Sequence, residues 1–445
     1  MLTRVCLSIA LLVALPACSQ VVPAATGGTP AVDNETPMQT PPPVSGEPYP
    51  TLTGSETRSN YLRGGLSFET AYDDNEVPYE TTHPIGDVMY SIRPTIAIDL
   101  TTPRFHQTLT YSPGFTFYQR TSGYNESDQN ASLSLQSRLS QHTAFHLRES
   151  FQKSSNVFNQ QYPYSGATIS GSPQSPTAGA IAPFADRLNN EASGEISYQL
   201  SANRMLGAGG TSTKLTYPNL SEVPGLCDSN SRGGSAFYNL RLSTSQYTGG
   251  TYQYSQFVSC PADKQSDTQT HAFYFYYTLY LMHALSMSFS GGPQYYSVAQ
   301  TPFPSSSSWT PSITGSMGWQ GSRTSLTASY SRTVNGGGGL LGAFHSNTAN
   351  AQARWQVTKP WTVEATANYE IHKNVDSLLS SSSPGGHTIS GTFAAERTLS
   401  ERLIAKFGYQ RQHQSYSSIP AIAVLPDSNR EYVSVSYQFE RPLGR

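Results

Sequence analysis

The sequence predicts an all-β protein, a transmembrane antiparallel β-barrel of about 18 strands. Three observations lead to this prediction. Apolar and polar residues alternate with a period of two along most of the chain, short and long connections follow one another in turn, and the composition is poor in charge and rich in tyrosine. Period-2 alternation places successive side chains on opposite faces of a strand.

The first residues, 1–17, have the layout of a secretory signal peptide. Arg4 is followed by the apolar run VCLSIALLVALPAC, which is too short to span a bilayer as a mature helix. The segment Leu15-Pro16-Ala17-Cys18 is similar to a bacterial lipobox, so we expect lipidation of Cys18. Pro16 departs from the usual residue there, and cleavage before Cys18 by the ordinary signal peptidase is the alternative.

Residues 18–60 are rich in Pro and Thr and show no periodicity. This composition predicts a flexible, disordered linker. The barrel itself is expected over residues 61–445.

The stretch NASLSLQSRLSQHTAFHLRESF, residues 130–151, is typical of the repeat. Leu133 and Leu135 alternate with Ser and Gln, and after a polar turn Phe145 and Leu147 alternate with His146 and Arg148. The apolar face of such a hairpin meets a core in a soluble sandwich and lipid in a membrane barrel. The hairpin alone does not decide between them.

The connections decide between them. Eight short turns, such as Ser140–Thr143 and Ser201–Arg204, alternate with nine longer connections, such as Asp73–Asp87 and Gln152–Asn190. A chain threaded back and forth through one bilayer has this arrangement, with strands of about ten residues. An even strand number places both ends of the barrel, and hence the N-terminal linker, on the periplasmic side.

Charged residues make up 13% of the chain and aromatic residues 11%, with 28 Tyr and 4 Trp. Soluble domains carry roughly 25% charged residues, and tyrosine suits the boundary between hydrocarbon and water. The net charge of −2 argues against nucleic acid as a partner.

The polar phase of the strands is expected to line the lumen. The predicted pore-lining residues are Arg138, His146, Arg148, Arg241, Arg354, Glu364, Glu370 and Lys406. Glu149 falls on the apolar phase, which requires a bulge, a site near the interface, or a different register. Pro94 and Pro113 lie inside adjacent strands, almost symmetrically about their turn, and suggest a shared kink.

Two cysteines remain after the leader and the lipidation site. Cys227 precedes one strand of a hairpin and Cys260 follows the other, so both emerge at the same external end. In an oxidising compartment we expect a disulfide between them, with two unpaired loop thiols as the alternative.

The Tyr111-Ser112-Pro113-Gly114-Phe115 segment, the hairpin at 130–151 and the hairpins that continue to Phe439 resemble the outer-membrane β-barrel porins of Gram-negative bacteria, in particular a group that accompanies exopolysaccharide synthesis and export. The resemblance implies an outer-membrane location and a pore for small polar solutes or saccharides. The alternative is a structural or polysaccharide-export accessory barrel with a filled lumen, loops that bind a partner, and contacts to export machinery. The chain departs from such barrels in continuing past its last aromatic residue, as ERPLGR.

Sequence signals for chemistry are few. No HExxH, CxxC, P-loop or GxSxG motif occurs, and we expect neither an enzyme nor a cofactor or metal site. Barrel-embedded phospholipases use Ser and His on neighbouring strands, but Ser is so abundant here that chance proximity is expected. The acidic cluster of Asp73, Asp74, Glu76 and Glu80 is interpreted as a solvated loop. A divalent-cation site is the alternative, but the spacing lacks the ordered ligand positions of a calcium loop. The long segment Gln152–Asn190 either narrows the channel or lies on the surface.

Overall fold

The computed structural model describes residues 60–74, 86–102, 104–154, 158, 186–222, 224–260, 266–282, 285–300, 304–336, 339–375, 385–416 and 427–443. The predicted leader, Cys18 and nearly all of the predicted linker lie outside these ranges. In the described part of the chain, no helix is long and apolar enough to cross a membrane.

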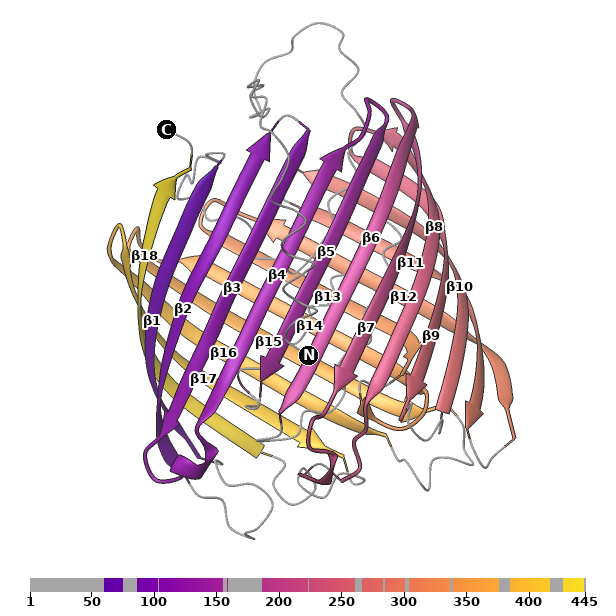
Figure 1. The fold of residues 1–445 in the computed structure, drawn as a ribbon. Helices are drawn as coiled ribbons and strands as arrows, with labels where there is room; N and C mark the ends of the chain where they lie inside the picture. Colours follow the sequence, from indigo (N-terminus) through magenta and orange to yellow (C-terminus); the bar gives the residue numbers. More distant parts are fainter. Residues whose placement is uncertain are drawn as a thin grey trace, which may run out of the picture.

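The fold is a closed antiparallel barrel of 18 strands (Figure 1). Each strand pairs with its neighbours in sequence, and β1 pairs with both β2 and β18, which closes the sheet. The predicted fold class and strand number are therefore confirmed. The strands are β1 (Tyr61–Asp73), β2 (Asp87–Thr102), β3 (Phe105–Tyr118), β4 (Glu126–Arg138), β5 (Thr143–Ser154), β6 (Arg187–Ser201), β7 (Arg204–Thr216), β8 (Ser229–Ser243), β9 (Gln246–Ser259), β10 (Ser266–Met282), β11 (Leu285–Gln300), β12 (Ser306–Gln320), β13 (Thr324–Asn335), β14 (Phe344–Gln356), β15 (Trp361–Asn374), β16 (Gly386–Ser400), β17 (Leu403–Ser415) and β18 (Asp427–Pro442).

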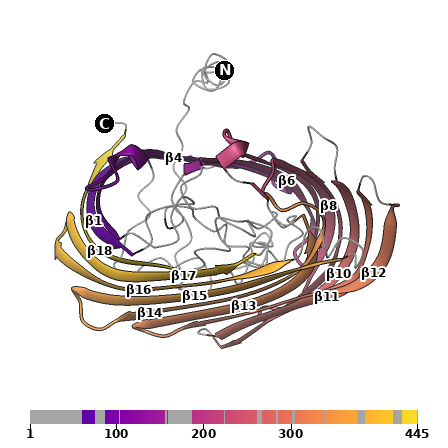
Figure 2. The ribbon, with the colours of Figure 1, turned by 90° about the horizontal axis from the view of Figure 1, so that it is seen from below.

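The two ends of the barrel differ in their connections. Turns of two to four residues join the strands at one end, where β1 also begins and β18 also ends, and longer connections lie at the other end. Two of these connections contain a short 3-10 helix, at Ser122–Tyr124 and Leu220–Glu222. The cross-section is flattened, with β1–β8 along one long side and β13–β17 along the other (Figure 2).

The inner face of the wall is identified by contacts that skip a strand, because side chains converge only on the concave side. The Tyr276 hydroxyl of β10 donates to Asn239 Oδ1 of β8 at 2.6 Å, and Ser312 Oγ of β12 donates to the Tyr274 hydroxyl of β10 at 3.2 Å. The same phase carries Ser, Thr and most charged residues. The opposite phase carries the large exposed apolar side chains, such as Phe275, 72% exposed. The outer wall is therefore apolar and the inner wall polar.

The strands are 12 to 17 residues long, longer than the predicted ten or so. The additional residues lie toward the long-connection end, where the outer face turns polar: Lys214, Arg232 and Lys373 are all exposed there. The apolar alternation that predicts a strand thus stops several residues before the hydrogen-bonded ladder does.

The strand register explains the residues that do not fit the regular strand pattern, Glu149, Pro94 and Pro113. Glu149 pairs with Leu133 and Ala192 without a register shift, so no bulge turns its side chain inward and it is exposed on the outer face. The β2–β3 pairing is interrupted between Ile92 and Ile96, and its register sets Pro94 opposite Pro113 in that gap. Proline donates no ladder hydrogen bond, and one shared gap accommodates both rings.

Candidate functional site in the barrel lumen

The structure places all eight predicted pore-lining residues on the inner face. Seven of them have at least partly exposed side chains: Arg138, His146, Arg148, Arg241, Arg354, Glu364 and Lys406. Glu370 also points inward, but it is only 1% exposed. The pore-lining role of these residues stays a prediction, since an inward position does not by itself show that solute passes them.

Charges on the two long walls are arranged differently. On β14–β17, opposite charges face one another directly across strand pairs: Arg354 opposite Glu364, and Glu396 opposite Lys406. On β4–β5, Arg138 and Arg148 are both exposed on the inner face. Directly paired opposite charges partly neutralise each other. Arg148 instead has diagonal acidic neighbours, because Glu191 and Glu195 flank its partner Ser193 on the inner face of β6.

A second charged group lies nearer the long connections, where β1 meets β18. Arg430 Nη2 is 3.2 Å from Asp73 Oδ2, and both side chains are almost fully buried. The guanidinium carbon of Arg430 lies 4.5 Å from the centre of the Phe158 ring, within cation–π range. Glu126 of β4 interacts electrostatically with Arg430 and accepts a hydrogen bond from the Tyr118 hydroxyl. Phe158 belongs to the long 152–190 segment, so this residue of the segment lies against the inner face of β18.

This group was not expected from the sequence, because Asp73 was interpreted as part of a solvated acidic loop. That interpretation is wrong for Asp73, which ends β1 and is 3% exposed. Asp74 follows the strand and is partly exposed, and its carboxylate accepts hydrogen bonds from the backbone and side-chain nitrogens of Asn429. The available signal was the strand alternation, which continues through Phe68, Thr70 and Tyr72 to place Asp73 on the inner phase.

The inner wall of β9–β13 carries no charge in the described residues. The two charged residues of these strands, Asp267 and Arg332, face outward. The inward side chains are mainly Ser, Thr, Gln and Tyr, and many are buried, including Thr278, Ser288 and Gln294. The Gln294 side-chain amide donates a hydrogen bond to the Val334 carbonyl, two strands away, and accepts one from the Val334 N–H. This end of the oval is therefore packed with its own side chains.

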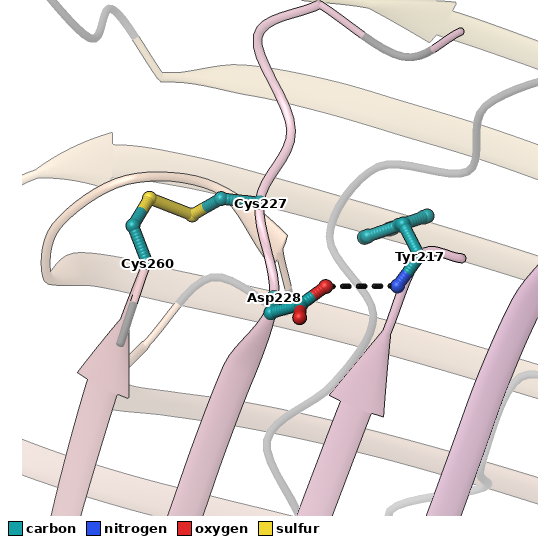
Figure 3. Close-up of a disulfide and its surroundings, with 4 residues drawn as sticks. All are labelled: Tyr217, Cys227, Asp228 and Cys260. Carbon is teal, nitrogen blue, oxygen red and sulfur yellow. Dashed lines mark hydrogen bonds between the residues drawn. A yellow bond between two sulfur atoms is a disulfide. The ribbon is translucent and has the colours of Figure 1, made fainter. Parts of the chain in front are cut away.

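The structure joins Cys227 and Cys260 by a disulfide, with a Cα–Cα distance of 5.2 Å (Figure 3). Ser229 and Ser259 are opposite one another in the β8–β9 ladder, which brings the two cysteines together just beyond the strand ends. The Asp228 carbonyl accepts a hydrogen bond from the Cys260 N–H, and its carboxylate accepts one from the Tyr217 N–H, both at 2.9 Å.

One Ser–His–Glu arrangement occurs on the inner face of β14–β15. His372 Nδ1 is 2.7 Å from Ser346 Oγ, and His372 Nε2 is 3.2 Å from Glu370 Oε1. Ser346 Oγ, however, donates its single proton to Asn335 Oδ1 at 2.7 Å. In this arrangement the hydroxyl proton points toward Asn335 and away from the imidazole. The side chains of Ser346, Glu370 and His372 are at most 2% exposed, so the arrangement is closed to solvent.

Comparison with known proteins gives structural likenesses only. No protein-family model and no curated protein sequence matches the chain. It is similar to the crystal structure of Acinetobacter baumannii OccAB4, with 8% identity, a TM-score of 0.43, and coverage of 87% of this chain and 99% of that one. It is also similar to the crystal structure of Pseudomonas aeruginosa OccK2 (OpdF), with 9% identity, a TM-score of 0.42, and coverage of 86% of this chain and 98% of that one. The FrpB iron transporter from Neisseria meningitidis (F3-3 variant) is 10% identical, with a TM-score of 0.37 and coverage of 81% of this chain and 62% of that one. At these scores the likenesses contribute nothing to the argument about function, which rests on the side chains described above.

Proposed function

We propose that the protein is a pore in the outer membrane of a Gram-negative bacterium and passes small polar solutes or saccharides. The observation that carries the proposal is the contrast between the two faces of one closed wall. Large apolar side chains are exposed outside, whereas Arg138, His146 and Arg148 are exposed inside. Such a wall is stable when lipid surrounds it and water fills at least part of its lumen.

The distribution of aromatic residues supports the membrane location. Trp319 and Trp355 are exposed on the outer wall near the short turns. A second aromatic group lies on the outer wall toward the long connections, where the Tyr295 ring contacts Trp309 and the Tyr254 ring contacts His271. Aromatic residues at two levels flank the apolar band of membrane barrels. In this orientation the short turns, the start of β1 and the predicted linker face the periplasm.

The alternative function is an accessory barrel for polysaccharide export, with a filled lumen and partner-binding loops. The contact between Phe158 and Arg430 favours it, because part of the longest connection then occupies the lumen. The same contact also suits a pore that is narrowed by this connection. Exopolysaccharide association and lipidation of Cys18 are proposals on which the described residues have no bearing.

Single-channel recording in planar bilayers separates the two functions. The purified full-length protein should produce discrete conductance steps if it is a pore, and none if the lumen is filled. Deletion of residues 165–178, within the longest connection, should raise the conductance if that connection narrows the channel. An unchanged conductance in the deletion variant would contradict the narrowing.

A further inference from the structure

Six buried side chains form an apolar cluster that joins the two long walls near the long-connection end. Figure 2 places β6 and β8 on the wall opposite β14 and β17, and β7 lies between β6 and β8 in the sheet. The members come from both walls and are between 0% and 6% exposed: Leu215 at the end of β7, Tyr217 and Leu226 from the connection after it, Leu340 before β14, Phe344 at its start, and Tyr416 after β17. Burial this complete requires that the two walls contact each other through these side chains.

Backbone contacts fix the connection that supplies Tyr217 and Leu226. The Cys227 N–H donates to the Gly339 carbonyl at 2.9 Å, which links the β7–β8 connection to the β13–β14 connection. Gly339 has φ of +103°, and a Cβ there would lie 2.9 Å from the Tyr217 hydroxyl, so glycine is needed at this position. The disulfide between Cys227 and Cys260 ties the same connection to the end of β9 (Figure 3).

The cluster covers part of the polar inner wall. His372 lies between Phe344 and Tyr416, with ring centres 6.0 and 6.3 Å away. Glu370 and His372 are each 1% exposed, although both point into the lumen. A solute that enters from the long-connection end therefore cannot reach this part of the wall while the cluster is intact.

We infer that the cluster of Leu215, Tyr217, Leu226, Leu340, Phe344 and Tyr416 sets the size limit for solutes at the outer opening, with the Cys227–Cys260 disulfide as its brace. The inference rests on the proposed pore function. It assigns a specificity-determining role to uncharged residues that act by occupying space in the lumen. Their effect is to exclude solute from the part of the lumen that they occupy.

The test compares variants of the full-length protein. One carries Leu226→Ser and Leu340→Ser, which places hydroxyls in the contact between the walls. A second carries Cys227→Ser and Cys260→Ser. The matched control is Leu220→Ser, because Leu220 lies in the same connection as Leu226 but is 46% exposed and outside the cluster. Folding of each variant is checked by its heat-dependent mobility in detergent gels.

Two readouts are used: single-channel conductance, and swelling of liposomes in neutral oligosaccharides of increasing size. Loss of the cluster should raise the conductance by roughly twofold, since pore current follows the open cross-section, and should admit longer oligosaccharides. A membrane-impermeant reductant should have a similar effect on the wild type but none on the double cysteine variant. Leu220→Ser should match the wild type.

The outcomes separate this inference from the proposed function. A conducting wild type whose cluster variants keep its conductance and size limit would overturn the inference and leave the pore intact. A silent wild type with conducting cluster variants would support the cluster as the closing element and contradict an open pore. Silence in every folded variant would overturn both.

Discussion

Replacement of Arg430 should destabilise the barrel more than replacement of its partner Asp73. The two residues are directly opposite in the β1–β18 ladder that closes the sheet, and their side chains are 2% and 4% exposed. At their separation of 3.2 Å, the Coulomb attraction amounts to about 5 kcal/mol at an effective dielectric constant of about 20, before the cost of desolvation. Removal of one partner of a buried pair typically costs about 3–5 kcal/mol.

The neighbours of the pair make the two substitutions unequal. Arg430→Met removes the cation that also interacts with Glu126 and the Phe158 ring, so we expect the full loss of about 3–5 kcal/mol. Asp73→Asn leaves Arg430 with those two contacts and should cost about 1–3 kcal/mol. The double variant should cost clearly less than the sum, because the second substitution removes a charge that the first left uncompensated.

The assay is urea unfolding of the barrel in lipid vesicles, followed by tryptophan fluorescence, for the wild type, both single variants and the double variant. Equal costs for the two single variants would show that Glu126 and Phe158 contribute nothing to the burial of Arg430. Additive costs in the double variant would refute the pair itself.

Three further predictions concern the wall. A cysteine at Arg148 should react readily with a small charged thiol reagent, whereas a cysteine at Glu370 should be protected, because the first side chain is exposed and the second is 1% exposed. Glu149→Leu should raise the free energy of unfolding in vesicles by about 1 kcal/mol, since a carboxylate on the outer wall near lipid is unfavourable. Gly292→Ala should destabilise the barrel by about 1–3 kcal/mol, because a Cβ there would overlap the Phe273 carbonyl oxygen.

Two of these predictions have a matched control, and the third has an outcome that would contradict it. A cysteine at Leu135, on the outer wall, should label poorly from the aqueous lumen, and the reverse pattern would invert the face assignment. A loss of stability in Glu149→Leu would indicate that the carboxylate has a partner in the membrane. Gly315→Ala introduces a Cβ at ordinary contact distance, 3.6 Å from the Phe289 ring, and should leave stability nearly unchanged; equal effects at both glycines would contradict the close approach at Gly292.

The sequence alone indicated the fold class, a strand number of about 18, and the face on which side chains lie in the regularly alternating strands. These properties are local, because a period of two in one strand and the length of one connection depend on neighbouring residues only. The placement of Cys227 and Cys260 at the same end also followed from one hairpin. Arg138, His146 and Arg148 were assigned to the inner face by the same local alternation.

The tertiary structure alone decided which inward residues meet open space. Glu370 has the same local pattern as Glu364, yet it is buried beside His372, whose ring lies near Phe344 of β14 and Tyr416 after β17. The Asp73–Arg430 pair joins residues 357 positions apart, and Leu215 meets Phe344 and Tyr416 across the lumen. Such contacts depend on the closure and flattening of the barrel, which bring together strands that are far apart in the chain, and no local pattern carries that information.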